Sequence, residues 1–136
     1  MNISALAVHA FDESHWGDLL AFADVVVPYD RAGNRVWLTN RKRFTATGRV
    51  RRHYAADGED GQMIAYGAIE QQSDESVYRL FIVPGAAGLW DTAGQALFQR
   101  LAEDLRNLGA TRVWMREYAQ DAELVRFAQL HGFAQV

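Results

Sequence analysis

The pattern of apolar and polar positions is most regular in the last third of the chain. From Thr92 onward, leucines recur at spacings of three and four residues, which is the period of an amphipathic helix. These leucines are Leu97, Leu101, Leu105 and Leu108. Gly109 is expected to end the helix. Residues 111–118 then alternate between apolar and polar and predict a strand, and residues 121–131 predict a final helix that ends at Gly132.

The first part of the chain predicts a short strand and two helices. An apolar run at residues 3–8 predicts the strand. Asp12 precedes a helical pattern that Pro28 limits, and residues 35–45 carry apolar positions among charges that predict a second helix.

The middle of the chain predicts antiparallel strands. Residues 49–56 and 62–70 predict a hairpin around the polar loop from Gly58 to Gly61, and residues 76–83 predict a third strand. The strand at residues 111–118 should lie beside this third strand, because a right-handed crossover through a helix joins them.

Composition and charge exclude several classes of function. The 136 residues make about one domain, with 49% hydrophobic residues available for a core. A net charge of −3 gives no reason to expect a nucleic-acid or anionic-membrane partner. The absence of cysteine excludes disulfides and thiolate nucleophiles, and the scattered histidines have no metal-ligand spacing. No signal peptide or transmembrane span is visible. We expect a cytoplasmic protein without a metal, nucleic-acid or membrane partner.

The clearest candidate chemistry lies where the third antiparallel strand joins the long helix. The strand ends at Val83 and Pro84, and a loop with glycines leads into the helix. A loop that enters a helix beside a sheet presents free backbone N–H groups, and the helix dipole favours an anion there. The segment is therefore a candidate phosphate site.

Three segments in this order resemble the GNAT superfamily of N-acetyltransferases. They are Leu80 to Pro84, Thr92 to Leu97, and Ala122 to Phe133. The resemblance implies an α+β fold over residues 1–136, with a mixed, mainly antiparallel sheet and helices on both faces. It also implies transfer of an acetyl group from acetyl coenzyme A to a small-molecule or protein amine by direct attack.

The resemblance also implies which residues bind the cofactor. The strand at Val77 to Val83 would carry a bulge and splay from the last strand, so that the main chain of Ile82 and Val83 binds the pantetheine arm and polarises the thioester. The loop amides would bind the pyrophosphate. The loop residues concerned are Trp90, Asp91, Thr92, Ala93, Gly94 and Gln95.

The loop departs from the family pattern. Such loops usually carry Arg or Gln followed by glycines at alternate positions, whereas this chain has Leu89, Trp90, Asp91 and Thr92 before Gly94. Trp90 is either a hydrophobic plug over the sheet or a residue that stacks on a ligand. Gly94 either approaches a phosphate or permits close packing of helix on sheet.

A second departure concerns proton transfer. Many family members have a tyrosine four residues before the final glycine, where this chain has Ala128. Proton transfer would instead run through ordered water or through Glu117 and Tyr118, and Tyr78 and His131 are other nearby candidates.

A third departure is length, because the family usually has another strand after the final Gly-Phe pair and this sequence stops at Val136. Either a homodimer or tandem-domain partner supplies that strand, or the sequence is a fragment of a longer protein. These departures leave an alternative function, a degenerate module that binds acyl coenzyme A or serves as a structural partner without catalysis.

Overall fold

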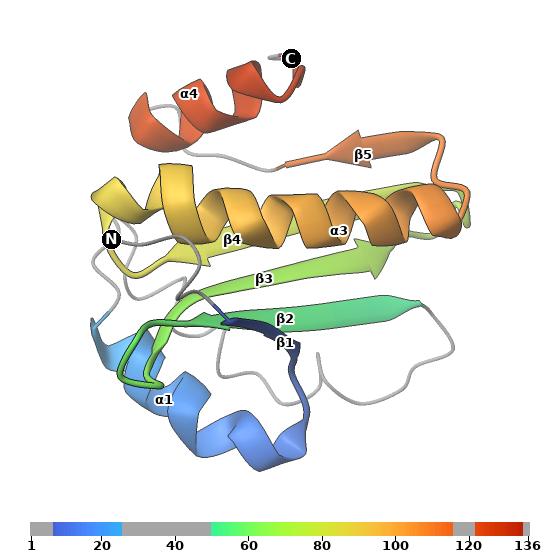
Figure 1. The fold of residues 1–136 in the computed structure, drawn as a ribbon. Helices are drawn as coiled ribbons and strands as arrows, with labels where there is room; N and C mark the ends of the chain where they lie inside the picture. Colours follow the sequence, from blue (N-terminus) through green and yellow to red (C-terminus); the bar gives the residue numbers. More distant parts are fainter. Residues whose placement is uncertain (1–6, 26–49, 116–121, 135–136) are drawn as a thin grey trace.

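The computed structural model describes residues 7–25, 50–115 and 122–134 (Figure 1). Within them a five-stranded sheet has the order β1-β2-β3-β4-β5. The strands are β1 (Ala7–Ala10), β2 (Arg51–Asp57), β3 (Met63–Gln71), β4 (Val77–Pro84) and β5 (Arg112–Trp114). The first four pair antiparallel, and β5 runs parallel to β4. The mixed, mainly antiparallel sheet and the predicted hairpin are thus confirmed.

Helices cover both faces of this sheet, as the sequence predicted. A 3₁₀ turn (Glu13–His15) leads into α1 (Trp16–Val25) on one face. The opposite face carries α3 (Gln95–Asn107), with α4 (Ala122–Leu130) beside it (Figure 1). The predicted helix at residues 35–45 lies outside the described residues, as does most of the predicted first strand.

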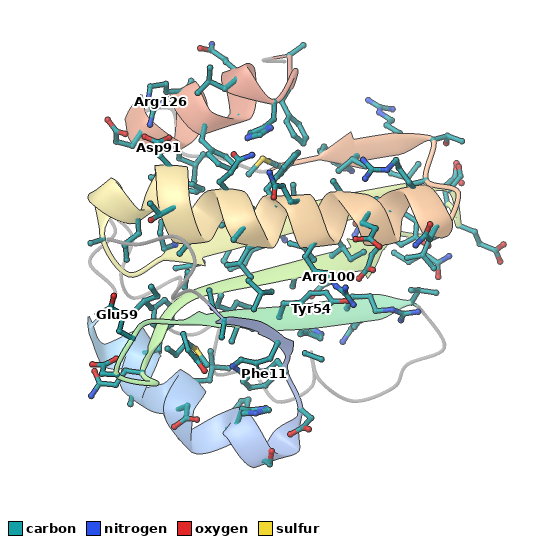
Figure 2. All side chains as sticks on the ribbon, viewed as in Figure 1. Phe11, Tyr54, Glu59, Asp91, Arg100 and Arg126 are labelled. Carbon is teal, nitrogen blue, oxygen red and sulfur yellow. The ribbon has the colours of Figure 1, made fainter. Side chains whose placement is uncertain are left out.

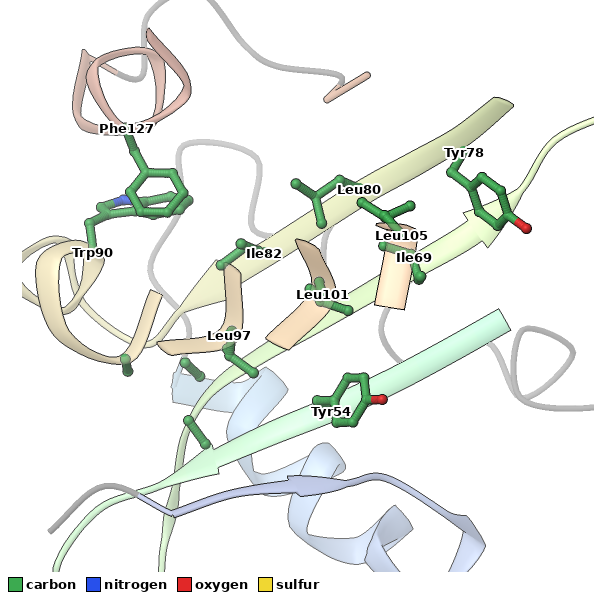
Figure 3. Packing of buried hydrophobic residues seen from close by; sticks show 13 residues of the cluster. Tyr54, Ile69, Tyr78, Leu80, Ile82, Trp90, Leu97, Leu101, Leu105 and Phe127 are labelled. Carbon is green, nitrogen blue, oxygen red and sulfur yellow. The ribbon is translucent and has the colours of Figure 1, made fainter. Parts of the chain in front are cut away.

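The leucine stripe of α3 forms the centre of the core. Leu97, Leu101 and Leu105 are buried against the sheet (Figure 3). They meet alternate side chains of β4, namely Tyr78, Leu80 and Ile82. The intervening side chain of Val83 packs on the other face with Phe22 and Leu19 of α1.

The expected bulge in β4 is absent. Its residues pair one to one with β3, from Ala65 opposite Pro84 to Gln71 opposite Tyr78. Because Ile82 and Val83 are buried against helices on opposite faces, an inserted residue would turn the following side chains to the wrong face. The only register shift among the described strand pairs lies between β2 and β3, at Ala56 and Asp57.

Polar contacts also attach the outer side of α3 to β2. The hydroxyl of Tyr54 donates a hydrogen bond to Asp104, and the guanidinium of Arg100 lies 5.1 Å from the centre of the Tyr54 ring (Figure 2). Burial, followed by the hydrogen bond to Asp104, raises the pKa of Tyr54. The helix is therefore positioned by both apolar and polar contacts.

Gly85, directly after β4, should tolerate no side chain. A Cβ atom there would lie 2.9 Å from the carbonyl oxygen of Ile64 and 3.3 Å from the Phe22 ring. We expect Gly85→Ala to lower the free energy of unfolding by about 1–3 kcal/mol, measured by urea denaturation. Gly88→Ala is the matched control, because a Cβ at Gly88 would meet no atom within 4 Å. Equal stability of the two variants would contradict this packing.

Candidate functional site

Within the described residues, the parallel pairing of β4 with β5 covers one end of β4. It comprises Val77 opposite Arg112, Tyr78 opposite Val113, and Arg79 opposite Trp114. β4 continues to Pro84, but within the described part of the chain no strand lies beside this second half on the β5 side. The open edge of β4 is the segment from Leu80 to Pro84.

Hydrogen bonds at the two ends of β4 define which backbone groups face this open edge. The N–H of Gly85 donates to Ile64 next to β3, whereas the carbonyl of Ser76 accepts from Thr111 next to β5. Strand backbone groups alternate sides residue by residue, so the N–H and C=O of Ile82 point to the open edge. Those of Val83 point toward β3, where Val83 lies opposite Tyr66.

The segment after β4 is helical where the sequence predicted a loop and a helix start at Thr92. A 3₁₀ turn (Ala87–Leu89) runs directly into a π-helical turn (Trp90–Gly94) and then into α3. Helical structure extends back because Leu89 and Trp90 pack on the core. Neither Leu89 nor Gly94, which precede the π turn and α3, makes a side-chain capping hydrogen bond. The helix start at Trp90 therefore has no side-chain cap, while the N–H of Leu89 donates to the carbonyl of Ala86 and that of Gln95 to the carbonyl of Thr92.

The inward side of this turn is filled by its own side chains. Trp90 is only 3% exposed and lies 4.8 Å from Phe127 of α4, measured between ring centres (Figure 3). Ala93 is buried beneath it. A Cβ on Gly94 would lie 3.1 Å from the Trp90 ring, so Gly94 makes room for the indole. Trp90 is therefore the hydrophobic plug, and its side chain is not presented to a ligand.

The outward side of the turn carries an ion-pair cluster. Nη2 of Arg126 lies 3.2 Å from both carboxylate oxygens of Asp91 and 3.1 Å from Glu123 (Figure 2). Hydrogen bonds to Glu123 and then to Asp91 raise the pKa of Arg126. The negative charge of Asp91 at the helix start is thus compensated from α4. Thr92 Oγ1 donates to the Leu89 carbonyl, at 3.5 Å.

Gln95 is engaged by the end of α4. Its Oε1 lies 2.7 Å from Nε2 of His131, whose ring packs against Phe98 and Phe127 at centroid distances of 4.0 and 4.6 Å. With the amide oxygen as acceptor, Nε2 carries the proton. Burial lowers the pKa of His131. This contact positions α4 on α3.

The lowered pKa of His131 predicts an acid-sensitive contribution to stability. The unfolded chain protonates this group near its ordinary pKa of 6.5, before the folded chain does. The contribution of His131 to the free energy of unfolding is therefore fully present above that pH and is lost as the pH falls toward the lowered pKa of the folded state. We expect the difference in Tm between the native chain and His131→Phe to change as the pH falls through 6.5 and below. A constant difference across this range would contradict the prediction.

The predicted catalytic residues Glu117 and Tyr118 lie outside the described residues, so their roles stay predictions. Tyr78 is buried on the α3 face, and Ala128 is buried in α4. Within the described residues, no group of three or more His, Asp or Glu side chains could hold a metal ion. None of the helices described is long and apolar enough to cross a membrane.

Arg126 is the site residue that the sequence analysis missed. Its spacing from Glu123 predicts a pair on one helix face. Its contact with Asp91 joins residues 35 positions apart, and no local pattern predicts it.

Comparison with solved structures identifies the fold. The chain aligns over 96% of its length with a GCN5-related N-acetyltransferase from Kribbella flavida, at 18% identity, 83% coverage of that chain and a TM-score of 0.72. It aligns over 97% with a GNAT-family acetyltransferase from Staphylococcus aureus Mu50, at 11% identity, 86% coverage and a TM-score of 0.78. It also aligns over 97% of its length with a chimera of Vibrio cholerae spermidine N-acetyltransferase SpeG and hSSAT, at 9% identity, 82% coverage of that chain and a TM-score of 0.74.

These similarities show that the chain has the GNAT acetyltransferase fold, in a sequence that has diverged far from those structures. No protein-family model and no curated protein matches it.

Proposed function

We propose that the chain is an acetyl coenzyme A dependent N-acetyltransferase that acts as a single domain in the cytoplasm on a small-molecule or protein amine. One observation carries the proposal: the outward backbone groups of Ile82 and the uncapped helix start at Trp90 lie at the same end of β4 (Figure 3), in a chain with the GNAT fold. The fold alone does not determine a function, so the proposal depends on the Ile82 backbone groups and the helix start at Trp90 lying at the same end of β4.

The residues present fit coenzyme A. A pyrophosphate needs N–H donors and positive potential. A helix start supplies positive potential, and no side chain caps this one. The negative charge of Asp91 would repel a bound pyrophosphate, but the ion pair with Arg126 compensates that charge. The main-chain groups of Ile82 can pair with the amides of a pantetheine arm as a neighbouring strand would.

The acetyl group would pass directly to the amine. Acetyl coenzyme A, when bound, supplies an acetyl thioester. The neutral amine nitrogen forms a bond to the acetyl carbon, the carbon–sulfur bond breaks, the thiolate leaves, and the amine proton passes to solvent. The N–H of Ile82 is the candidate donor to the carbonyl oxygen, where negative charge develops. Glu117, Tyr118 or ordered water would transfer the proton.

Backbone NMR tests the placement of the cofactor. On titration with coenzyme A, we expect amide chemical shifts to change most at Ile82 and at the turn from Trp90 to Gln95. Shift changes concentrated instead at β1, the far edge strand of the sheet, and at α1, on the opposite face, would contradict the proposed site.

Arg126 should contribute to cofactor affinity. Arg126 contacts Asp91 and Glu123 through Nη2, and a guanidinium carries N–H donors on three nitrogens, so it can bond a phosphate as well. We expect Arg126→Ala to weaken acetyl coenzyme A binding about tenfold, more at low salt than at high salt. Arg106→Ala, in the last turn of α3, is the matched control and should bind normally. Equal acetyl coenzyme A affinities of the two variants would show that Arg126 does not contribute to cofactor binding.

A second candidate function is a module that binds acyl coenzyme A without catalysis. It is favoured by Ala128, which lies buried where a tyrosine acid would be expected. Release of free coenzyme A thiol in the presence of amines distinguishes the two functions. Binding without thiol release across a broad panel of amines would favour the module.

The outer edge of β5 also suits a partner strand. Within the described residues, β5 pairs only with β4 and leaves its other edge open. A homodimer or tandem-domain partner would complete the sheet there. Native mass spectrometry tests this, since a strict monomer of ordinary stability would contradict a shared sheet.

A further inference from the structure

We propose that His131 is a positioning residue of the cofactor site. Together with Arg126 and Phe127 it attaches α4 to the turn that precedes α3, and this turn binds coenzyme A most tightly while His131 is neutral. The inference rests on the proposed function and adds a residue through which pH regulates that site.

Two contacts attach the middle of α4 to the π-helical turn. The Phe127 ring lies 4.8 Å from the Trp90 ring, measured between centres (Figure 3). Nη2 of Arg126 lies 3.2 Å from Asp91, the residue that follows Trp90 (Figure 2). Because Arg126 and Phe127 are neighbours in α4, a movement of this helix would break both contacts together.

A third contact attaches the end of α4 to the first residue of α3. Nε2 of His131 lies 2.7 Å from Oε1 of Gln95. The His131 ring also lies 4.0 Å from that of Phe98 and 4.6 Å from that of Phe127, measured between ring centres. α4 is therefore attached both at the start of the turn and directly after its end.

A positive charge on His131 would oppose this attachment. Its ring faces uncharged groups, namely two phenylalanine rings and the amide of Gln95. The charged groups of the neighbouring contact, Asp91 and Arg126, are paired with each other. Burial is the cause that lowers the pKa of His131, and no carboxylate among the described residues offsets it. Protonation is therefore favoured when the ring leaves these contacts, so a fall in pH detaches the end of α4.

Detachment of α4 would weaken cofactor binding through Asp91. In the attached form, Arg126 compensates the carboxylate of Asp91 at the helix start. Once Arg126 moves away with α4, this carboxylate repels the pyrophosphate. The coupling is reciprocal, so bound coenzyme A should lower the pKa of His131 further.

The first measurement is made without cofactor. NMR follows the His131 ring and the backbone amides from Trp90 to Gln95 as the pH falls through 6.5 and below. We expect the amide shifts to change with the same midpoint as the His131 ring, and circular dichroism checks that the sheet stays folded. His131→Gln keeps an N–H donor for Gln95 but cannot titrate, so it should abolish this change. His15→Gln, which removes a histidine just before α1, is the matched control and should preserve it.

The second measurement is the Kd of acetyl coenzyme A against pH, by isothermal titration calorimetry. A phosphate monoester on the cofactor titrates with a pKa of about 6 whichever variant binds it, so each variant is compared with the native chain at the same pH. As the pH falls through 6.5, we expect the Kd of the native chain to rise about threefold more than that of His131→Gln. His131→Phe keeps an aromatic ring without a titrating group and provides a second variant, for which we expect the same weak pH dependence.

Amide shifts that stay constant while His131 titrates would overturn the inference and leave the cofactor site intact. The same conclusion would follow if the Kd of the native chain and that of His131→Gln depended equally on pH. If acetyl coenzyme A binds at no pH, the proposed function fails and this role of His131 fails with it.

Discussion

Trp90→Ala is expected to lower the free energy of unfolding by about 3–5 kcal/mol, because it removes a buried indole that joins the start of α3 to Phe127 of α4. For a chain of this size the loss corresponds to a fall in Tm of roughly 10 °C or more. Urea denaturation and thermal unfolding followed by circular dichroism measure both quantities.

Trp114→Ala is the matched control for this substitution. Its indole is largely exposed on an edge strand, so its free energy of unfolding should stay within about 0.5 kcal/mol of the native value. If Trp90→Ala were as stable as this control and lost only cofactor affinity, Trp90 would be a ligand-stacking residue and its assignment as a core plug would be wrong.

Leu101→Ala is the second substitution with a large expected effect, a loss of about 2–5 kcal/mol in the free energy of unfolding. Leu101 is fully buried between α3 and the sheet. Leu130→Ala makes the same substitution at an exposed position and should lower the free energy of unfolding far less.

A double-mutant cycle tests directly whether Leu101 of α3 packs on Gly67 of β3. A Cβ on Gly67 of β3 would lie 3.0 Å from Cδ1 of Leu101. Gly67→Ala should therefore destabilise the native chain, and its cost should fall by about 1 kcal/mol in the Leu101→Ala background. Additive costs would contradict a direct contact between these two positions.

Regular periodicity made the central elements of the fold predictable from sequence. The leucine stripe of α3 reports one buried face, and the structure buries Leu97, Leu101 and Leu105 as that stripe predicts. Gly109 and Gly132 end their helices with positive φ angles of 75° and 84°. Local sequence patterns were therefore enough to predict those elements that bury a single face.

The candidate site was less predictable because long-range packing defines it. The helix starts earlier than Thr92 because Leu89 and Trp90 pack on the core, which no local start signal reports. The partner of Asp91 comes from α4, 35 residues further along the chain. The expected bulge in β4 followed from family resemblance, whereas the packing of β4 between two helical layers favours a regular strand.

The central claim is that the open edge of β4 and the helix start at Trp90 bind acetyl coenzyme A. Isothermal titration calorimetry of the chain with acetyl coenzyme A tests it most directly. We expect one molecule bound per chain and a rise in Tm that grows with cofactor concentration. No heat of binding and no change in Tm at millimolar acetyl coenzyme A would contradict the claim.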